Sequence, residues 1–66
     1  MAVIRVIEIL SNSKKSWEDA TSTGIKKASE SVKGIKSAFV KSQSVTVKDG
    51  EVDEYRVNLK VSFEVK

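Results

Sequence analysis

The chain has 66 residues, of which 12 are Lys or Arg and 9 are Asp or Glu, and its formal net charge at pH 7 is +3. It contains no Cys and no His, which excludes disulfide bonds, zinc sites built on these residues, and catalysis by a thiol or an imidazole. A chain of this length makes one domain, residues 1–66, and buries only about 60% of its unfolded surface. We therefore expect oligomerisation to stabilise the fold.

The basic residues are scattered along the chain and do not form the cluster that indicates nucleic-acid binding. The longest apolar run, residues 3–10, is interrupted by Arg5 and Glu8, and it is far shorter than the roughly 20 residues that cross a bilayer. No signal-peptide pattern precedes it. These features predict a cytoplasmic protein that binds neither nucleic acid nor membrane.

The first predicted element is a strand over residues 2–10, which are rich in β-branched side chains. The polar residues 11–13 end it. Its apolar residues occupy both odd and even positions, which indicates that both faces of this strand are buried or that one of them meets another subunit.

A helix is predicted next, with Ser16 as N-cap and Asp19 completing an approximate capping box. Gly34 is the residue expected to end it in a left-handed conformation. Apolar and small residues recur at spacings of three and four and predict one inward stripe: Trp17, Ala20, Gly24, Ile25, Ala28 and Val32. Because Gly24 costs about 1 kcal/mol relative to Ala within a helix, we interpret it as a place where the helix lies very close to a sheet.

A second strand is predicted over residues 35–47, and a third over residues 55–65. The Asp49-Gly50 pair between them is a strong signal for a β-hairpin. The third strand alternates without a break between apolar and polar residues for its whole length. An apolar face this regular has to be covered, so we place this strand at the centre of the sheet.

The element order is therefore β-α-β-β, and a right-handed crossover leaves room for the third strand between the first two. We predict an α+β fold in which a three-stranded antiparallel sheet of order 1-3-2 wraps around one helix. The other face of the sheet, with Arg56, Asn58, Lys60 and Ser62, is left bare in a monomer. This bare face also predicts association.

Two motifs carry a resemblance to a known family. The sequence Ser-x-x-Ser-Trp-Glu-x-Ala at residues 13–20 and the sequence Tyr-Arg-Val-x-Leu-x-Val-Ser-Phe at residues 55–63 resemble the dodecin family over essentially the whole chain. The resemblance implies a hollow homododecamer of β-α-β-β subunits with cubic-type symmetry. It also implies non-enzymatic binding of flavin, either riboflavin or FMN, for storage and for quenching of the excited flavin.

The resemblance further implies a flavin site, but the chain departs from the family pattern there. The tryptophan that sandwiches the flavin ring in flavin-binding members falls at Ser37, and the glutamine that bonds the ring edge falls at Arg56. Loss of a stacking ring costs on the order of 1 to 3 kcal/mol. Trp17 is interpreted as a core residue rather than as a replacement. The candidate flavin-binding residues are Ser37, Phe39, Gln43, Arg56 and Asn58.

Two of these residues have alternative interpretations. Phe39 lies two positions beyond Ser37 and so on the same face of the strand, where it either stacks on a ring or packs against a neighbouring subunit. The Arg56 guanidinium either donates to ligand oxygens and stacks on a ring, or forms a salt bridge with Glu54 or with a carboxylate of another subunit.

Four acidic residues around the hairpin, Asp49, Glu51, Asp53 and Glu54, suggest calcium, which takes oxygen ligands. The EF-hand pattern is not met, and the alternative is a solvated turn, although a carboxylate repeated around a symmetry axis also makes a cation site. Three non-enzymatic hypotheses remain. They are a dodecin-type flavin store with an altered site, a flavin-independent shell that binds calcium or another small ligand, and a basic module that adds a strand to a sheet edge.

Overall fold

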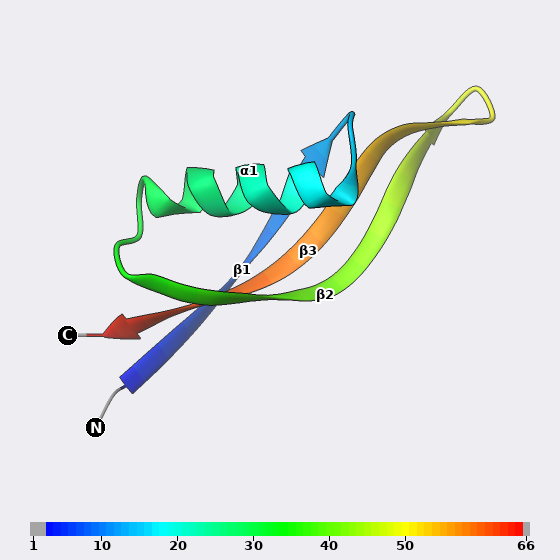
Figure 1. The fold of residues 1–66 in the computed structure, drawn as a ribbon. Helices are drawn as coiled ribbons and strands as arrows, with labels where there is room; N and C mark the ends of the chain where they lie inside the picture. Colours follow the sequence, from blue (N-terminus) through cyan, green and yellow to red (C-terminus); the bar gives the residue numbers. More distant parts are fainter. Residues whose placement is uncertain (1–2, 66) are drawn as a thin grey trace.

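The computed structural model describes residues 3–65. Four elements follow one another along the chain (Figure 1): β1 (Val3–Ser13), α1 (Trp17–Ser29), β2 (Ile35–Lys48) and β3 (Glu51–Val65). The sheet order is β1-β3-β2, and β3 is antiparallel to both of its neighbours. The predicted β-α-β-β fold with sheet order 1-3-2 is confirmed.

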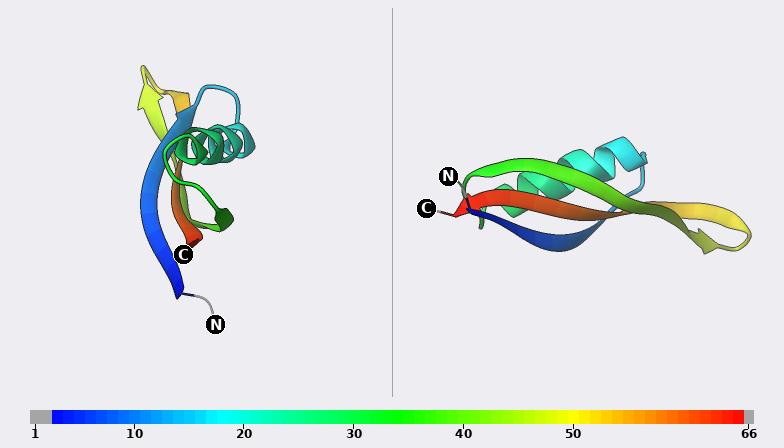
Figure 2. Two further views of the ribbon diagram at one scale, coloured as in Figure 1. Left: turned by 90° about the vertical axis from the view of Figure 1, so that its left-hand side faces the viewer. Right: turned by 90° about the horizontal axis from the view of Figure 1, so that it is seen from below.

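The molecule has two layers, because α1 lies across one face of the curved sheet and leaves the other face open (Figure 2). Its core lies between them, where Val57, Leu59 and Val61 of β3 and Ala20 of α1 are fully buried. These three β3 residues are alternate positions of one strand and therefore share a face. Partly buried hydrophobic residues surround them: Ile7, Ile9, Trp17, Ile25, Ile35 and Ala38.

The start of α1 is capped as the sequence predicts, but the capping box is built differently. The Ser16 Oγ accepts a hydrogen bond of 2.9 Å from the Asp19 N–H. The Asp19 carboxylate accepts from the Ser13 hydroxyl at 2.6 Å, and this hydroxyl also accepts from the Lys15 N–H at 2.9 Å. The buried Ser13 thus links the end of β1 to the start of α1.

The predicted end of the helix at Gly34 is wrong. The helix ends at Ser29, with Glu30 as C-cap, because the N–H groups of Ser31 and Val32 both donate to the Ala28 carbonyl, at 3.1 and 2.9 Å, and close a tight turn there. Gly34 has a φ of +78° and lies directly before β2. Its left-handed conformation starts the second strand and plays no part in ending the helix.

Gly24 marks the closest approach of α1 to the sheet. A Cβ atom at this position would lie 2.9 Å from the Ser11 Cβ and 3.5 Å from the Leu59 Cδ1. Both distances involve residues of the sheet beneath the helix. The interpretation of Gly24 as a contact point between helix and sheet is confirmed.

A two-residue turn connects β2 to β3, and both of its residues have positive φ, 52° at Asp49 and 78° at Gly50. This is the backbone that an Asp-Gly hairpin turn requires. The hairpin extends past the N-terminal start of α1 (Figure 1), and the molecule is 50 Å long but only 19 Å and 14 Å across. We call residues 46–54 the arm. Within residues 3–65, no helix is long and apolar enough to cross a bilayer.

Candidate functional site

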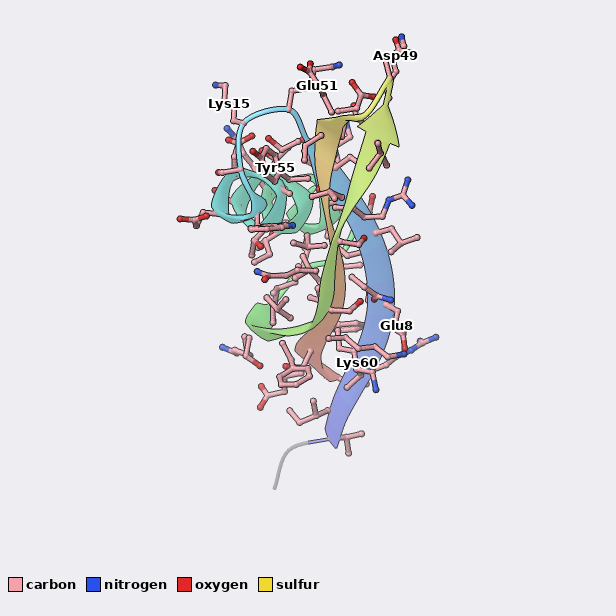
Figure 3. The ribbon with its side chains drawn as sticks, turned by 90° about the vertical axis from the view of Figure 1, so that its right-hand side faces the viewer. Glu8, Lys15, Asp49, Glu51, Tyr55 and Lys60 are labelled. Carbon is pink, nitrogen blue, oxygen red and sulfur yellow. The ribbon has the colours of Figure 1, made fainter. Side chains whose placement is uncertain are left out.

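The candidate site lies on the face of the sheet that α1 leaves uncovered. Residues paired across antiparallel strands point to the same side, and Val57, Leu59 and Val61 point toward α1, so the β3 residues between them and their partners point away. We call this surface the open face. Its rows across β1, β3 and β2 are Asn12–Arg56–Ser44, Leu10–Asn58–Ser42, Glu8–Lys60–Phe39 and Val6–Ser62–Ser37. Figure 3 shows Tyr55 on the helix side and Glu8 and Lys60 on the other.

Four of the five predicted site residues share the open face: Ser37, Phe39, Arg56 and Asn58. The fifth, Gln43, lies opposite Val57 and so faces the helix side of the sheet. A register shift between Val40 and Ser42 causes this separation, because an extra residue in one strand inverts the side on which the following residues point. The structure therefore does not bring Gln43 together with the other four residues.

Ser37 takes part in a serine pair that joins β2 to β3. Its hydroxyl forms a short hydrogen bond with the Ser62 hydroxyl, which also approaches the Ser37 carbonyl at 3.4 Å. This position therefore offers hydroxyl groups and no aromatic surface. The nearest aromatic residue along the strand is Phe39, whose side chain is open to solvent. The exposed fraction of Phe39 is 66%.

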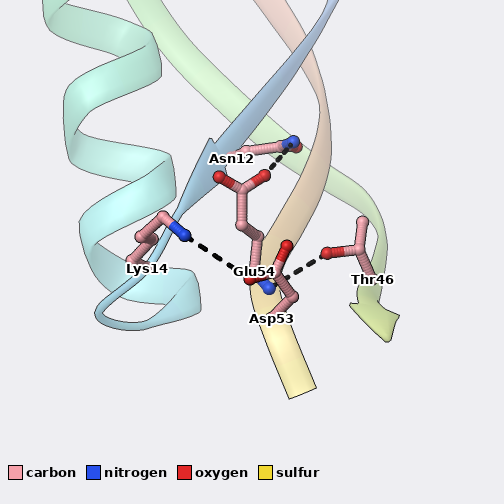
Figure 4. Close-up of polar contacts among 5 residues, drawn as sticks. All are labelled: Asn12, Lys14, Thr46, Asp53 and Glu54. Atoms are coloured by element: carbon pink, nitrogen blue, oxygen red, sulfur yellow. Dashed lines mark hydrogen bonds and ion pairs between the residues drawn. The ribbon is translucent and has the colours of Figure 1, made fainter. Parts of the chain in front are cut away.

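Arg56 belongs to a relay of polar side chains across β1 and β3. Its Nε donates to the Asn12 Oδ1 at 3.0 Å, and the Asn12 Nδ2 donates to the Glu54 Oε1 at 3.0 Å. Figure 4 shows Asn12 and Glu54 together with the Glu54 N–H bonded to Thr46 at 3.0 Å. Within the described chain, Arg56 reaches Glu54 only through Asn12, so the direct salt bridge considered above is replaced by a relay.

Asn58 carries an unsatisfied acceptor. Its Oδ1 is buried and has no hydrogen-bond partner among the described residues. A buried acceptor without a donor costs on the order of 1 to 3 kcal/mol. Asn58 lies between Leu10 and Ser42 on the open face, and a donor from a ligand or from a second copy of the chain would reach its Oδ1 once the side chains that cover this oxygen move aside.

An ion pair spans the open face beside Asn58. The Lys41 Nζ lies 3.4 Å from the Glu8 Oε1, and both side chains are about half exposed. Lys41 is the extra residue of the bulge between Val40 and Ser42, and its side chain connects β2 to β1 over the intervening β3. Exposed pairs of this kind contribute at most about 1 kcal/mol.

The acidic residues of the arm do not form a cation site within one chain. Asp53 pairs with Lys14 at 3.4 Å (Figure 4), and Glu54 accepts from Asn12. Over residues 3–65, no group of three or more carboxylates is arranged to hold a metal ion. A calcium site built on three or more carboxylates would therefore need ligands from more than one chain.

Trp17 has the structural role that the sequence indicates. Its ring meets the Tyr55 ring edge to face, with centroids 5.2 Å apart and an interplanar angle of 78°. Its Nε1 donates to the Ser44 carbonyl at 3.0 Å. Trp17 therefore ties the start of α1 to both β2 and β3. The sequence analysis did not identify Asn12 and Ser62 as site residues, because only the strand register places them beside Arg56 and Ser37.

Comparison with known proteins decides the family. The dodecin family model matches residues 3–66. The chain belongs to the dodecin family. Calcium dodecin of Mycobacterium tuberculosis is 36% identical over 66 residues, which cover 100% of this chain and 93% of that protein. The predicted family membership is thereby confirmed.

Dodecin structures match the fold described above. The crystal structure of the M. tuberculosis calcium dodecin, described as a calcium-chelating antigen with a novel calcium-binding site, superposes with a TM-score of 0.85 at 37% identity and covers 97% of this chain and 91% of its own. The dodecin from Streptomyces davaonensis superposes with a TM-score of 0.93 at 25% identity, covering 98% and 96%. The β-α-β-β unit is therefore the dodecin fold.

Proposed function

We propose that this dodecin forms a homododecamer that stores or buffers a small ligand in the cytoplasm without catalysing a reaction, and that this ligand is calcium rather than flavin. The observation that carries the proposal is the serine pair Ser37–Ser62 on the open face. The resemblance places the flavin-stacking tryptophan at this position, and a pair of hydrogen-bonded hydroxyls cannot sandwich a flavin ring.

The flavin site of the resemblance is altered in two further respects. Gln43 faces the helix side of the sheet, opposite Val57. The Arg56 Nε is already occupied by the Asn12 Oδ1. Among the five candidate flavin-binding residues, only Phe39 has an aromatic ring. Stacking on one exposed ring contributes at most about 1 to 3 kcal/mol to binding.

One relative supports the cation. The protein that is 36% identical to this chain is named calcium dodecin, and its crystal structure is described as containing a calcium-binding site. Calcium takes six to eight oxygen ligands. A single chain does not gather three carboxylates among its described residues, so we expect the ion to lie between copies, where symmetry repeats each carboxylate.

A weakened flavin site is the second candidate, and two observations favour it. Phe39 is exposed on the same face as Arg56 and Asn58. The Asn58 Oδ1 is a buried acceptor that lacks a donor, and an N–H group on the edge of a flavin ring would satisfy it. In this arrangement Phe39 stacks on one side of the ring and Asn58 bonds its edge.

A thermal unfolding experiment with a chelator tests the calcium proposal. Protein is stripped with a chelator, desalted, and unfolded with and without calcium, with magnesium as the control cation. A ligand at about 100 times its dissociation constant stabilises the folded state by about 2.7 kcal/mol. When three copies share one bound ion, this stabilisation amounts to about 0.9 kcal/mol per chain. A stabilisation of this size raises the Tm by about 4 °C or more.

Two further measurements on the same stripped protein complete the test. Light scattering gives the particle mass, and a flavin titration followed by fluorescence reports stacking. A twelve-subunit particle whose Tm responds to calcium and which leaves flavin fluorescence unchanged supports the proposal. Strong quenching of flavin fluorescence, together with a Tm that does not respond to calcium, would favour the flavin site over the calcium proposal. A monomeric particle would overturn both candidate functions.

A further inference from the structure

The arm exposes apolar side chains that its own chain leaves uncovered. Val47 and Val52 face each other across the β2–β3 pair, with 65% and 52% of their surfaces exposed. The arm lies beyond the N-terminal start of α1, so the helix does not cover this part of the sheet (Figures 1 and 2). A protruding apolar pair of this kind indicates a contact with another chain.

The tip of the arm carries two carboxylates, Asp49 and Glu51, and one lysine, Lys48, which lies opposite Glu51 in the strand register. Asp53 and Glu54 are held at its base by Lys14 and Asn12, but Asp49 and Glu51 lie farther out, at the extremity of the molecule (Figure 3). Both side chains are exposed, and within residues 3–65 neither has an ion-pair partner. The tip therefore presents two carboxylates that are available to another molecule.

The opposite end of the molecule is basic. Lysines gather where α1 ends and β2 begins: Lys26, Lys27, Lys33 and Lys36. Lys33 and Lys36 line a hollow of about 350 Å³ together with Gly34 and Glu64. The space next to Gly34 is open, because a Cβ atom there would meet no atom within 4 Å. In the described chain, Lys33 and Lys36 have no ion-pair partner.

We infer that the arm of one copy docks into the Lys33–Lys36 hollow of a second copy, with Asp49 and Glu51 paired to these lysines and with Val47 and Val52 covered by the neighbour. The two surfaces lie at opposite ends of a molecule 50 Å long and cannot meet within one chain, and their opposite charges point to another copy as the occupant. Opposite charges on the two surfaces fix the head-to-tail direction.

A head-to-tail contact joins two different surfaces of the chain. A closed assembly built on this contact is therefore a ring. The three-fold axes of a cubic twelve-subunit particle provide such rings. The inference rests on the proposed homododecamer but not on the identity of its ligand. It assigns the arm to assembly, whereas the proposed ligand site depends on the open face or on the symmetry axes.

A charge swap tests this contact. The arm variant combines Asp49→Asn, which keeps the residue type favoured in the turn, with Glu51→Lys. The end variant combines Lys33→Glu with Lys36→Glu. A third protein carries all four substitutions. Particle mass is measured by light scattering over a dilution series at about 0.05 M salt, where charge screening is weak.

We expect each two-substitution variant to raise the concentration of half-dissociation about ten-fold or more, since like charges then face each other. In the four-substitution protein, the lysine at position 51 faces the two new glutamates while position 49 is neutral, so the half-dissociation concentration should return to within about three-fold of the original value. Misfolding would persist in this protein, so its recovery separates a contact effect from a folding effect. Raising the salt to about 1 M should also promote dissociation of the unsubstituted protein.

Glu18→Lys with Ser22→Lys is the matched control, since it adds the same three charges as the arm variant on exposed helix positions. It should leave the particle intact. The docking inference is overturned if either swap leaves the dodecamer unchanged, if the four-substitution protein stays dissociated, or if the control dissociates equally. If the unsubstituted protein is a dodecamer but the four-substitution protein stays dissociated, only the docking inference is refuted. If the unsubstituted protein is a monomer, the proposed homododecamer is refuted as well.

Discussion

The two faces of the sheet differ although β3 contributes alternate residues to both. On the helix side, Val57, Leu59 and Val61 are fully buried. On the open face, Leu10 and Phe39 are 67% and 66% exposed, and a buried acceptor on Asn58 has no donor among residues 3–65. The first face is completed by the chain itself. The second face stays exposed in the single chain, which is why the candidate functional site is assigned to it, whereas assembly is assigned to the arm.

Leucine truncation on each face measures this difference most directly. Leu59→Ala should lower the free energy of unfolding by about 2 to 5 kcal/mol, because it leaves a cavity beneath α1. Leu10→Ala makes the same chemical change on the open face, where it should cost no more than about 0.5 kcal/mol in the dissociated chain. Urea unfolding gives both losses in the free energy of unfolding, when the two variants are compared at the same particle mass. Equal losses would show that the open face is buried within the single chain.

A ring placed on the open face tests the role of residue 37. Ser37→Trp should tighten flavin binding by about 5- to 150-fold, since one stacked ring contributes on the order of 1 to 3 kcal/mol. Ser37→Ala is the control, because it removes the bond to Ser62 without adding a ring, and it should leave the flavin affinity unchanged. Fluorescence titration measures both variants. An unchanged affinity of Ser37→Trp in a particle of normal mass would exclude this face as a flavin site.

On the helix side of the sheet, we expect a smaller change in stability from a substitution at Gly24. Gly24→Ala gains up to about 1 kcal/mol of helix propensity, but its Cβ would lie 2.9 Å from the Ser11 Cβ, and such overpacking costs about 1 to 3 kcal/mol. We expect a net destabilisation of about 1 kcal/mol in thermal unfolding. Ser22→Ala, at an exposed position of the same helix, should be neutral or stabilising. Stabilisation by Gly24→Ala would show that the helix can move away from β1.

Much of the fold follows from local patterns in the sequence. The alternation in residues 55–65 predicts the central strand, the Asp49-Gly50 pair predicts the hairpin turn, and Ser16 predicts the N-cap. Element ends were less predictable, because they depend on pairing partners. The polar residues 11–13 continue β1 since they pair with β3, up to Ser13 opposite Tyr55, and β3 begins at Glu51 since the hairpin continues to its turn.

The candidate site was only partly predictable for the same reason. Four residues share the open face as expected, but the register shift after Val40 moves Gln43 to the helix side. No residue in this part of β2 signals such a shift, since it contains neither Gly nor Pro. The relay from Arg56 through Asn12 to Glu54 joins residues more than 40 positions apart in the chain, and only the paired strands reveal it.

The extra residue Lys41 marks one of three register shifts in the pairing of β2 with β3. Val40 and Ser42 pair with Leu59 and Asn58, which are neighbours in β3, so Lys41 itself has no partner in this register. Deletion of Lys41 would therefore leave the residues on either side of it paired as they are now, and each would keep the face on which it points. A single-codon loss could thus remove the ion pair between Lys41 and Glu8 while the other side chains of the open face stay in place.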